Sequence, residues 1–192
     1  MTQPNPHDAL FKAAFADPEH AAGELRFILP AALVARMDFA TLTLEPGSYI
    51  DEALKERQSD VLFSVLMSGK RTLAYVLFEH QSSVDRLMSF RLLRYMVRIW
   101  ERHLAGDVRG DRLPMILPIV LHHSATGWTA ATQFSDLLDI APDLFPAVAE
   151  LVPRFRSVID DYYLTNPISR ASAVMAECSA LAERRATMTA AE

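Results

Sequence analysis

Two apolar segments joined by a short polar turn dominate the hydrophobic pattern of this chain. They cover about residues 59–67 and 72–80, and the sequence Ser-Gly-Lys-Arg occupies 68–71 between them. Both segments are apolar at consecutive positions, which is typical of central strands that are covered on both faces. Gly-X at the centre of a two-residue loop favours a type II′ hairpin, so we expect Gly69 and Lys70 to form the turn.

This turn fixes which residues of the two strands face each other. Counting back along the ladder from the predicted loop places Asp60 opposite Glu79. Opposed residues in an antiparallel pair have Cβ atoms roughly 4.5–5.5 Å apart, and Gln81 shares the face of Glu79 because strand side chains alternate. Two carboxylates this close repel each other unless a proton or a cation intervenes. A hard divalent cation such as Mg²⁺ suits this oxygen-rich site.

The rest of the pattern predicts helices around a mixed sheet. A strand, a long helix and a further strand form a right-handed crossover with parallel strands. The predicted order is therefore αβββαβ, an α/β class with one mixed central sheet flanked by helices. The other elements expected in chain order are a helix from Asp8, a helix over 17–30, a strand over 41–45, a long helix, a strand over 113–121, short helices over 134–138 and 147–151, and an edge strand over 155–164.

The long helix is predicted to start at Ser82 or Ser83 and to run to about Leu104. Apolar residues recur on it every three or four positions, which indicates an apolar face. They are Phe90, Leu93, Val97, Trp100 and Leu104. A second stripe with the same spacing consists of Arg91, Arg94, Arg98 and Arg102. These arginines either solvate the helix or contact the phosphates of a nucleic acid.

Composition narrows the class of protein. The chain has 192 residues, of which 51% are hydrophobic, so it can form one globular domain, predicted over 1–168 with a helical tail over 169–192. Its net charge of −5 means that nucleic-acid binding requires a local basic surface. The single cysteine, Cys178, excludes an internal disulfide and fits a reducing compartment. With neither a signal peptide nor a membrane-spanning segment in the sequence, we expect a soluble cytoplasmic protein.

The acidic hairpin resembles the core of the metal-dependent PD-(D/E)XK nucleases, in which a strand-borne Asp precedes a strand-borne Glu-X-Lys. The chain is similar above all to one branch, the recombination-promoting nuclease (Rpn) or YhgA-like putative transposase family. The segments that carry this resemblance are 7–12, 57–63, 79–83, 90–101 and 117–122. The resemblance covers roughly residues 5 to 165. It implies Mg²⁺-assisted hydrolysis of DNA phosphodiester bonds and a role in recombination.

The resemblance also assigns roles to individual residues. Asp60 and Glu79 are the implied ligands of Mg²⁺ or another divalent cation, with the backbone carbonyl of His80 as a further ligand. Gln81 stands where the wider superfamily usually places lysine. Glutamine can orient the attacking water, but it brings no positive charge to the scissile phosphate. Glutamine at this place is usual in the branch, so a nuclease stays the leading hypothesis.

Two accessory residues precede the hairpin. Asp8 either caps the first helix or is the helix-borne acid of the superfamily's first motif. Lys12 lies one turn further along the same helix face and could supply the missing positive charge. The expected partner is DNA, no membrane is involved, and a homodimer stays open as the assembly.

Other polar residues give weaker signals. His122 and His123 are adjacent on a strand and therefore point to opposite faces, which favours a capping or supporting role over zinc binding. Asp160 and Asp161 lie far along the chain, with nothing in the sequence that connects them to the acidic pair. Two alternatives to a nuclease are a catalytically weak or inactive nuclease-fold protein that binds or regulates, and an interaction module that self-associates through apolar surface.

Overall fold

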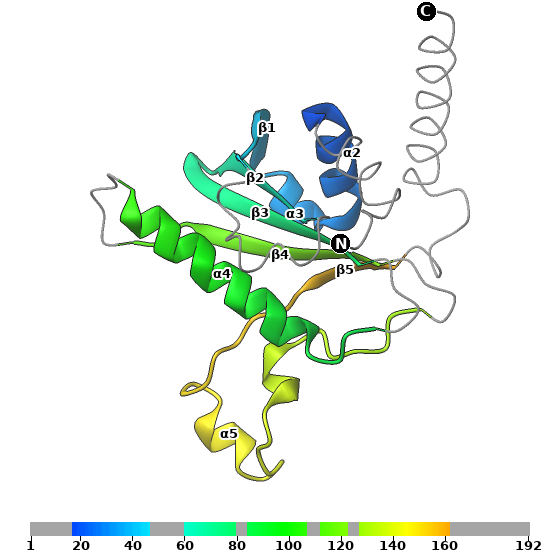
Figure 1. Cartoon of the computed structure of the whole chain (residues 1–192), viewed down its shortest axis with the longest axis vertical. Coiled ribbons are helices and arrows are strands. Elements are labelled where there is room, and N and C mark those ends of the chain that lie inside the picture. The colour runs from blue at the N-terminus through cyan, green and yellow to red at the C-terminus, as the bar shows by residue number, and fades with distance from the viewer. Residues whose placement is uncertain (1–16, 47–59, 80–83, 107–111, 123–126, 162–192) are drawn as a thin grey trace, which may run out of the picture.

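A five-stranded sheet in the order β1-β2-β3-β4-β5 runs through the described part of the chain (Figure 1). The computed structural model describes residues 17–46, 60–79, 84–106, 112–122 and 127–161. The strands are β1 (Met37–Leu44), β2 (Asp60–Met67), β3 (Lys70–Glu79), β4 (Met115–His122) and β5 (Val158–Asp161). The first three strands pair antiparallel, whereas β3, β4 and β5 pair parallel. The mixed sheet and the αβββαβ order are therefore confirmed.

Helices cover both faces of this sheet. The helical elements are α2 (Pro18–Ile28), α3 (Ala31–Val34), α4 (Met88–Ala105), the 3₁₀ turn η3 (Phe134–Leu137) and α5 (Phe145–Val148). The predicted start of α2 is confirmed, because the Asp17 side chain accepts a hydrogen bond from the Glu19 N–H at 2.8 Å. Pro18 occupies the first turn, where a helix needs no N–H donor. No helix in the described ranges is long and apolar enough to cross a membrane.

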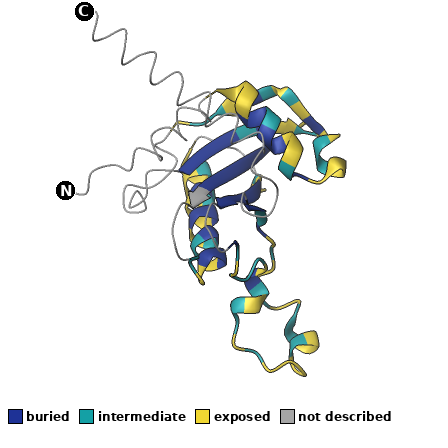
Figure 2. Ribbon diagram, turned by 90° about the vertical axis from the view of Figure 1, so that its right-hand side faces the viewer, coloured by how far each residue is buried: buried dark blue, intermediate teal, exposed yellow. Residues whose placement is uncertain are grey.

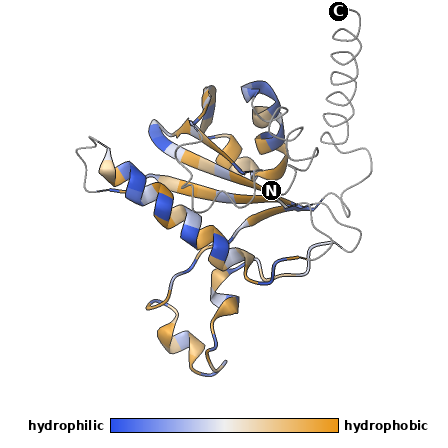
Figure 3. Cartoon of the chain, in the orientation of Figure 1, coloured by the Kyte–Doolittle hydropathy of each residue, from blue (hydrophilic) through white to orange (hydrophobic). Residues whose placement is uncertain are grey.

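Two hydrophobic cores lie on the two faces of the sheet. One packs Leu25 of α2 against alternate strand residues that include Phe63 and Val76. The other packs Leu92 of α4 against the intervening strand residues, among them Leu62. The central strands β2, β3 and β4 are accordingly dark along most of their length in Figure 2 and largely apolar in Figure 3. Burial on both faces explains why the central strands read as continuous apolar runs rather than as alternating ones.

The hairpin turn lies at Ser68-Gly69, so the predicted loop at Gly69-Lys70 is wrong. Met67 pairs with Lys70, and the φ angles of Ser68 and Gly69 are 50° and 75°. Two successive positive φ values are the geometry of a type I′ turn, whose twist matches that of the flanking strands. Gly69 adopts this conformation without a steric penalty because it has no Cβ.

The displaced turn shifts the ladder by two residues. Asp60 faces Leu77, and the predicted pairing of Asp60 with Glu79 is wrong. A shift of two keeps every side chain on its predicted face, because the alternation along a strand has a period of two. Position 79 is therefore a diagonal neighbour of Asp60 on the same face, at a typical separation of roughly 7–8 Å. The side chain of Glu79 lies outside the described part of the chain.

Helix α4 buries a different stripe from the predicted one. Phe90, Val97 and Leu104 are 47%, 42% and 57% exposed, whereas Trp100 of the predicted stripe packs against the core beneath α4. The residues that face the sheet are Met88, Ser89, Leu92, Tyr95, Met96 and Ile99. The prediction failed because this helix carries large side chains on more than one side, so a spacing of three and four residues fits two stripes. The face of the sheet beneath α4 packs against the stripe that contains Met88 and Tyr95.

Several boundaries also differ from the prediction. Helix α4 begins at Met88, after a turn in which the Asp85 side chain accepts a hydrogen bond from the Leu87 N–H at 2.9 Å. The expected caps at 82–83 lie outside the described residues. Strand β1 begins at Met37, four residues before its predicted start at 41. The two short helical turns and the edge position of β5 are confirmed. The predicted tail over 169–192 is not among the described residues.

Candidate functional site

Polar residues gather at one end of the sheet. Because β2 runs antiparallel to β3, the first residue of β2 lies at the same end as the last residues of β3, β4 and β5. These end residues are Asp60, Glu79, His122 and Asp161. The parallel pairing places Glu79, His122 and Asp161 in one row across three strands. The carboxyl ends of parallel strands are a common location for ligand sites in α/β proteins.

All four positions lie on the face of the sheet that α4 covers. Leu62, Leu77, Val120 and Ile159, each two positions away along its strand, pack in the core beneath α4. The described polar side chains of this row are also withdrawn from solvent. Asp60 is 7% exposed, His122 0% and Asp161 8%. Polar groups this deeply buried require hydrogen-bond partners or ligands, since desolvation is costly.

Asp60 is held by a tyrosine from the neighbouring strand. The Tyr75 hydroxyl donates a hydrogen bond to Oδ2 of Asp60 at 2.7 Å, and the Tyr95 ring lies 5.0 Å from the Tyr75 ring. Burial raises the pKa of Tyr75 well above its usual value near 10, and the charge of Asp60 raises it further. The same two causes, in the same order, raise the pKa of Tyr95. Both phenols therefore stay protonated and can act as donors beside the carboxylate.

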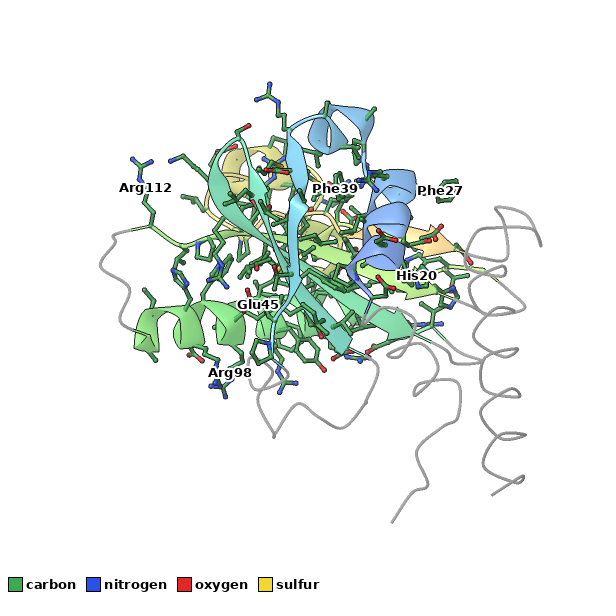
Figure 4. All side chains as sticks on the ribbon, turned by 90° about the horizontal axis from the view of Figure 1, so that it is seen from above. His20, Phe27, Phe39, Glu45, Arg98 and Arg112 are labelled. Carbon is green, nitrogen blue, oxygen red and sulfur yellow. The ribbon has the colours of Figure 1, made fainter. Side chains whose placement is uncertain are left out.

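The arginine stripe of α4 divides into two parts. Arg91 is half-buried, and its guanidinium carbon lies 5.8 Å from the centroid of the Tyr95 ring. Its positive charge lowers the pKa of both tyrosines, against the effect of burial and of Asp60. Arg94 and Arg102 are exposed, and Arg98 forms a 2.9 Å ion pair with Glu101 on the outer side of the helix (Figure 4). Arg91 alone among these four lies beside the acidic end of the sheet.

Sequence reasoning missed a second buried cluster, which joins β4, β5 and the segment before η3. Nδ1 of His122 lies 3.4 Å from Oδ1 of Asp161, and the backbone N–H of Trp128 donates a hydrogen bond to Oδ2 of Asp161. The rings of His122 and Trp128 meet edge to face, with their centroids 5.1 Å apart. The available signal was that two strands ending in His-His and Asp-Asp could pair in parallel. Trp128 also packs against the core beneath α4.

The remaining predicted site residues are not described. Asp8, Lys12, His80 and Gln81 all fall in the omitted ranges, so their roles stay predictions. In the described ranges, no three His, Cys, Asp or Glu side chains are grouped as metal ligands. Asp60 is the predicted ligand whose side chain is described, and its neighbour on the ladder diagonal is position 79.

Comparison with known proteins gives a consistent result. Residues 5–172 match a family model described as "Putative transposase, YhgA-like". The chain is 43% identical over 140 residues to the recombination-promoting nuclease RpnC of Escherichia coli strain K12, covering 72% of this chain and 46% of that protein. It is 42% identical over 118 residues to RpnA of the same strain, covering 62% and 40% of the two chains.

A further relative carries a different description. The chain is 40% identical over 125 residues to the "Inactive recombination-promoting nuclease-like protein RpnE" of Escherichia coli strain K12, covering 65% of this chain and 41% of that protein. The chain thus spans less than half of the length of these three relatives. No solved structure matches it.

Proposed function

Because the chain belongs to the YhgA-like putative transposase family, whose matched relatives include recombination-promoting nucleases, we propose that it is a Mg²⁺-dependent DNA endonuclease acting in recombination. Its mixed sheet and flanking helices have the PD-(D/E)XK architecture. The observation that carries the proposal is the placement of Asp60. This buried carboxylate begins β2 and shares one face and one end of the sheet with position 79, the second acid of the motif.

The donor set fits a hard divalent cation. Asp60 and Glu79 supply carboxylate oxygens in this proposal, and the backbone carbonyl of His80 adds a neutral oxygen, which are the ligand types that Mg²⁺ prefers. When bound, such a cation lowers the pKa of a water ligand and neutralises charge on the scissile phosphate. Tyr75 fixes the orientation of Asp60 through its 2.7 Å hydrogen bond.

The other residues complete the proposed site. Gln81 orients the attacking water. Arg91 brings a positive charge to the side of Asp60 and the two tyrosines, where it offsets the absence of a lysine at position 81. A guanidinium is suited to this role because it stays protonated at all relevant pH values and binds phosphate oxygens in a bidentate manner. Lys12 remains a second candidate for the same charge.

A plasmid assay tests the proposed activity. The protein is expected to nick supercoiled DNA in the presence of Mg²⁺, to stop when EDTA is added and to resume when Mg²⁺ is restored in excess. The physical reason is that, without the cation, two neighbouring carboxylates repel the phosphate backbone instead of activating a water. Agarose-gel conversion of supercoiled to open-circular plasmid measures the rate. Undiminished nicking in EDTA would contradict the proposed metal dependence.

A second candidate function is DNA binding without cleavage by a protein that keeps the nuclease fold. The relative described as inactive, 40% identical over 125 residues, favours it, and so does the glutamine at position 81. This candidate predicts that the protein shifts labelled DNA in a gel but leaves plasmid intact with Mg²⁺ or Mn²⁺. The plasmid assay therefore separates the two functions directly.

The exposed arginines of α4 are expected to provide part of the DNA-binding surface. Each lysine or arginine that neutralises a phosphate contributes about 0.9 to the slope of log K against log salt. The double substitution Arg94→Gln and Arg102→Gln should therefore make this slope shallower by about two. Fluorescence anisotropy with a labelled duplex at several salt concentrations measures this slope.

The control pair is Arg36→Gln and Arg154→Gln, two exposed arginines outside α4 with the same total charge change. Equal slopes in the α4 pair and the wild type would place the DNA surface elsewhere.

A further inference from the structure

The proposed reaction gives no task to His122, a fully buried polar side chain. His122 is 0% exposed, and its Nε2 has no hydrogen-bond partner within the described structure. A buried polar atom without a partner is destabilising, because nothing compensates for the loss of its hydration. Histidine at position 122 is therefore less favourable than phenylalanine if packing is the only role of the side chain, because phenylalanine would contact Trp128 without an unsatisfied nitrogen.

The neighbours of His122 determine which nitrogen carries the proton. Asp161 faces Nδ1 at 3.4 Å, and its other carboxylate oxygen already accepts the Trp128 backbone N–H. Because a carboxylate can only accept, the neutral imidazole places its proton on Nδ1. Nε2 then presents a lone pair. The two ring nitrogens point in divergent directions, so Nε2 is turned away from β5.

The lone pair lies at the acidic end of the sheet. His122 is the register partner of Glu79, and β3 lies between β4 and β2, the strand that begins with Asp60. Asp60 and His122 lie on the face of the sheet that α4 covers, and position 79 lies on the strand between them. A buried imidazole lone pair that no donor satisfies can instead bind a cation, and neutral imidazole is the commonest metal ligand in proteins. Metal-bound histidines typically donate their second ring N–H to a carboxylate, which is the relation of His122 to Asp161.

We propose that Nε2 of His122 is a nitrogen ligand of the divalent cation at this end of the sheet, oriented by Asp161. The inference rests on the proposed metal-dependent function and adds a ligand that the acidic motif does not contain. It also changes the expected metal selectivity. Mg²⁺ is bound almost entirely through oxygen, whereas imidazole favours transition metals. We therefore expect Mn²⁺ to bind more tightly than Mg²⁺.

Electron paramagnetic resonance with Mn²⁺ alone tests this ligand without an activity measurement. Mn²⁺ is titrated into the full chain, the free-ion signal gives the Kd, and electron spin echo modulation reports nitrogen bound directly to the metal. The wild type is expected to show nitrogen coupling that changes when histidine is labelled with ¹⁵N. In His122→Phe the coupling should disappear and the Kd for Mn²⁺ should rise at least about tenfold. His103→Phe, in the last turn of α4, is the matched control and should keep both.

Further variants address the fold and the orienting carboxylate. Asp161→Asn should weaken Mn²⁺ binding by about 10–100-fold while nitrogen coupling persists at saturation. If His122→Phe does not fold, His122→Gln is used in its place. The nitrogen coupling of the wild type tests the proposal without any variant. Bound Mn²⁺ without nitrogen coupling, or coupling that survives in a His122 variant, would overturn the inference. If the inference is overturned but the protein still nicks plasmid with Mg²⁺, the proposed nuclease function is still supported. Absence of both Mn²⁺ binding and nicking would overturn both.

Discussion

Replacing Asp60 with asparagine is expected to abolish nicking and to leave the fold intact. The substitution keeps the size of the side chain and an oxygen that can accept the Tyr75 hydroxyl. It removes one of the two charges that the proposed cation requires. Loss of a single group that stabilises a transition state typically costs about 10²–10³ in rate, and loss of a metal ligand should cost at least as much. Rates with Mg²⁺ in the plasmid assay measure the effect.

Thermal unfolding in EDTA separates a functional role of Asp60 from a structural one. Asparagine still accepts the Tyr75 hydroxyl but loses the charge that strengthens this bond, while it also removes repulsion from the acid proposed at position 79, so the melting temperature should change little. Asp139→Asn, an exposed carboxylate far along the chain, is the matched control and should retain wild-type nicking. Full activity in Asp60→Asn would exclude the metal assignment. A melting temperature far below that of the wild type would show that the carboxylate mainly supports the fold.

The element order could be predicted because each element carries its own local signal. The central strands are continuous apolar runs, and α2 has an Asp-Pro-Glu start. The position of the hairpin turn carried no such signal. A ladder displaced by two residues leaves every side chain on the same face, so the hydrophobic pattern is equally satisfied by either register. The two positive φ angles at Ser68 and Gly69 settle the turn, and only the structure gives them.

The site was predictable only where its residues form a local motif. Asp60 and Glu79 belong to one hairpin, so their shared face follows from alternation once the loop has two residues, as it does in both registers. His122 and Asp161 are separated by 39 positions, and they meet because a four-residue strand pairs parallel to β4. No periodicity within either segment reports that pairing. Arg91 lies beside the site and the other three arginines do not, because of how α4 is rotated about its axis. The sequence leaves this rotation open, since the helix carries two apolar stripes.

Tyr75 connects the candidate site to the core beneath α4. It is 0% exposed and is among the largest fully buried side chains of the described structure. Tyr75→Ala should lower the free energy of unfolding by about 3–5 kcal/mol, the usual range for truncation of a buried aromatic ring. That is a large fraction of the total of about 5–15 kcal/mol for a typical domain. Urea denaturation followed by tryptophan fluorescence measures the change.

Tyr75→Phe removes only the hydroxyl and isolates its bond to Asp60. Loss of a hydrogen bond to a charged group should cost about 1.5–3 kcal/mol at pH 7. The raised pKa of Tyr75 means that the folded state holds this proton more tightly than the unfolded chain, whose phenols titrate near pH 10. The stabilisation is therefore complete below about pH 10 and is lost as the pH rises further. Tyr75→Phe should lose less stability than the wild type between pH 8 and about pH 11, although Tyr95 retains part of the effect. If the free energy of unfolding fell equally in the two proteins over this pH range, the pKa of Tyr75 would not be raised by folding.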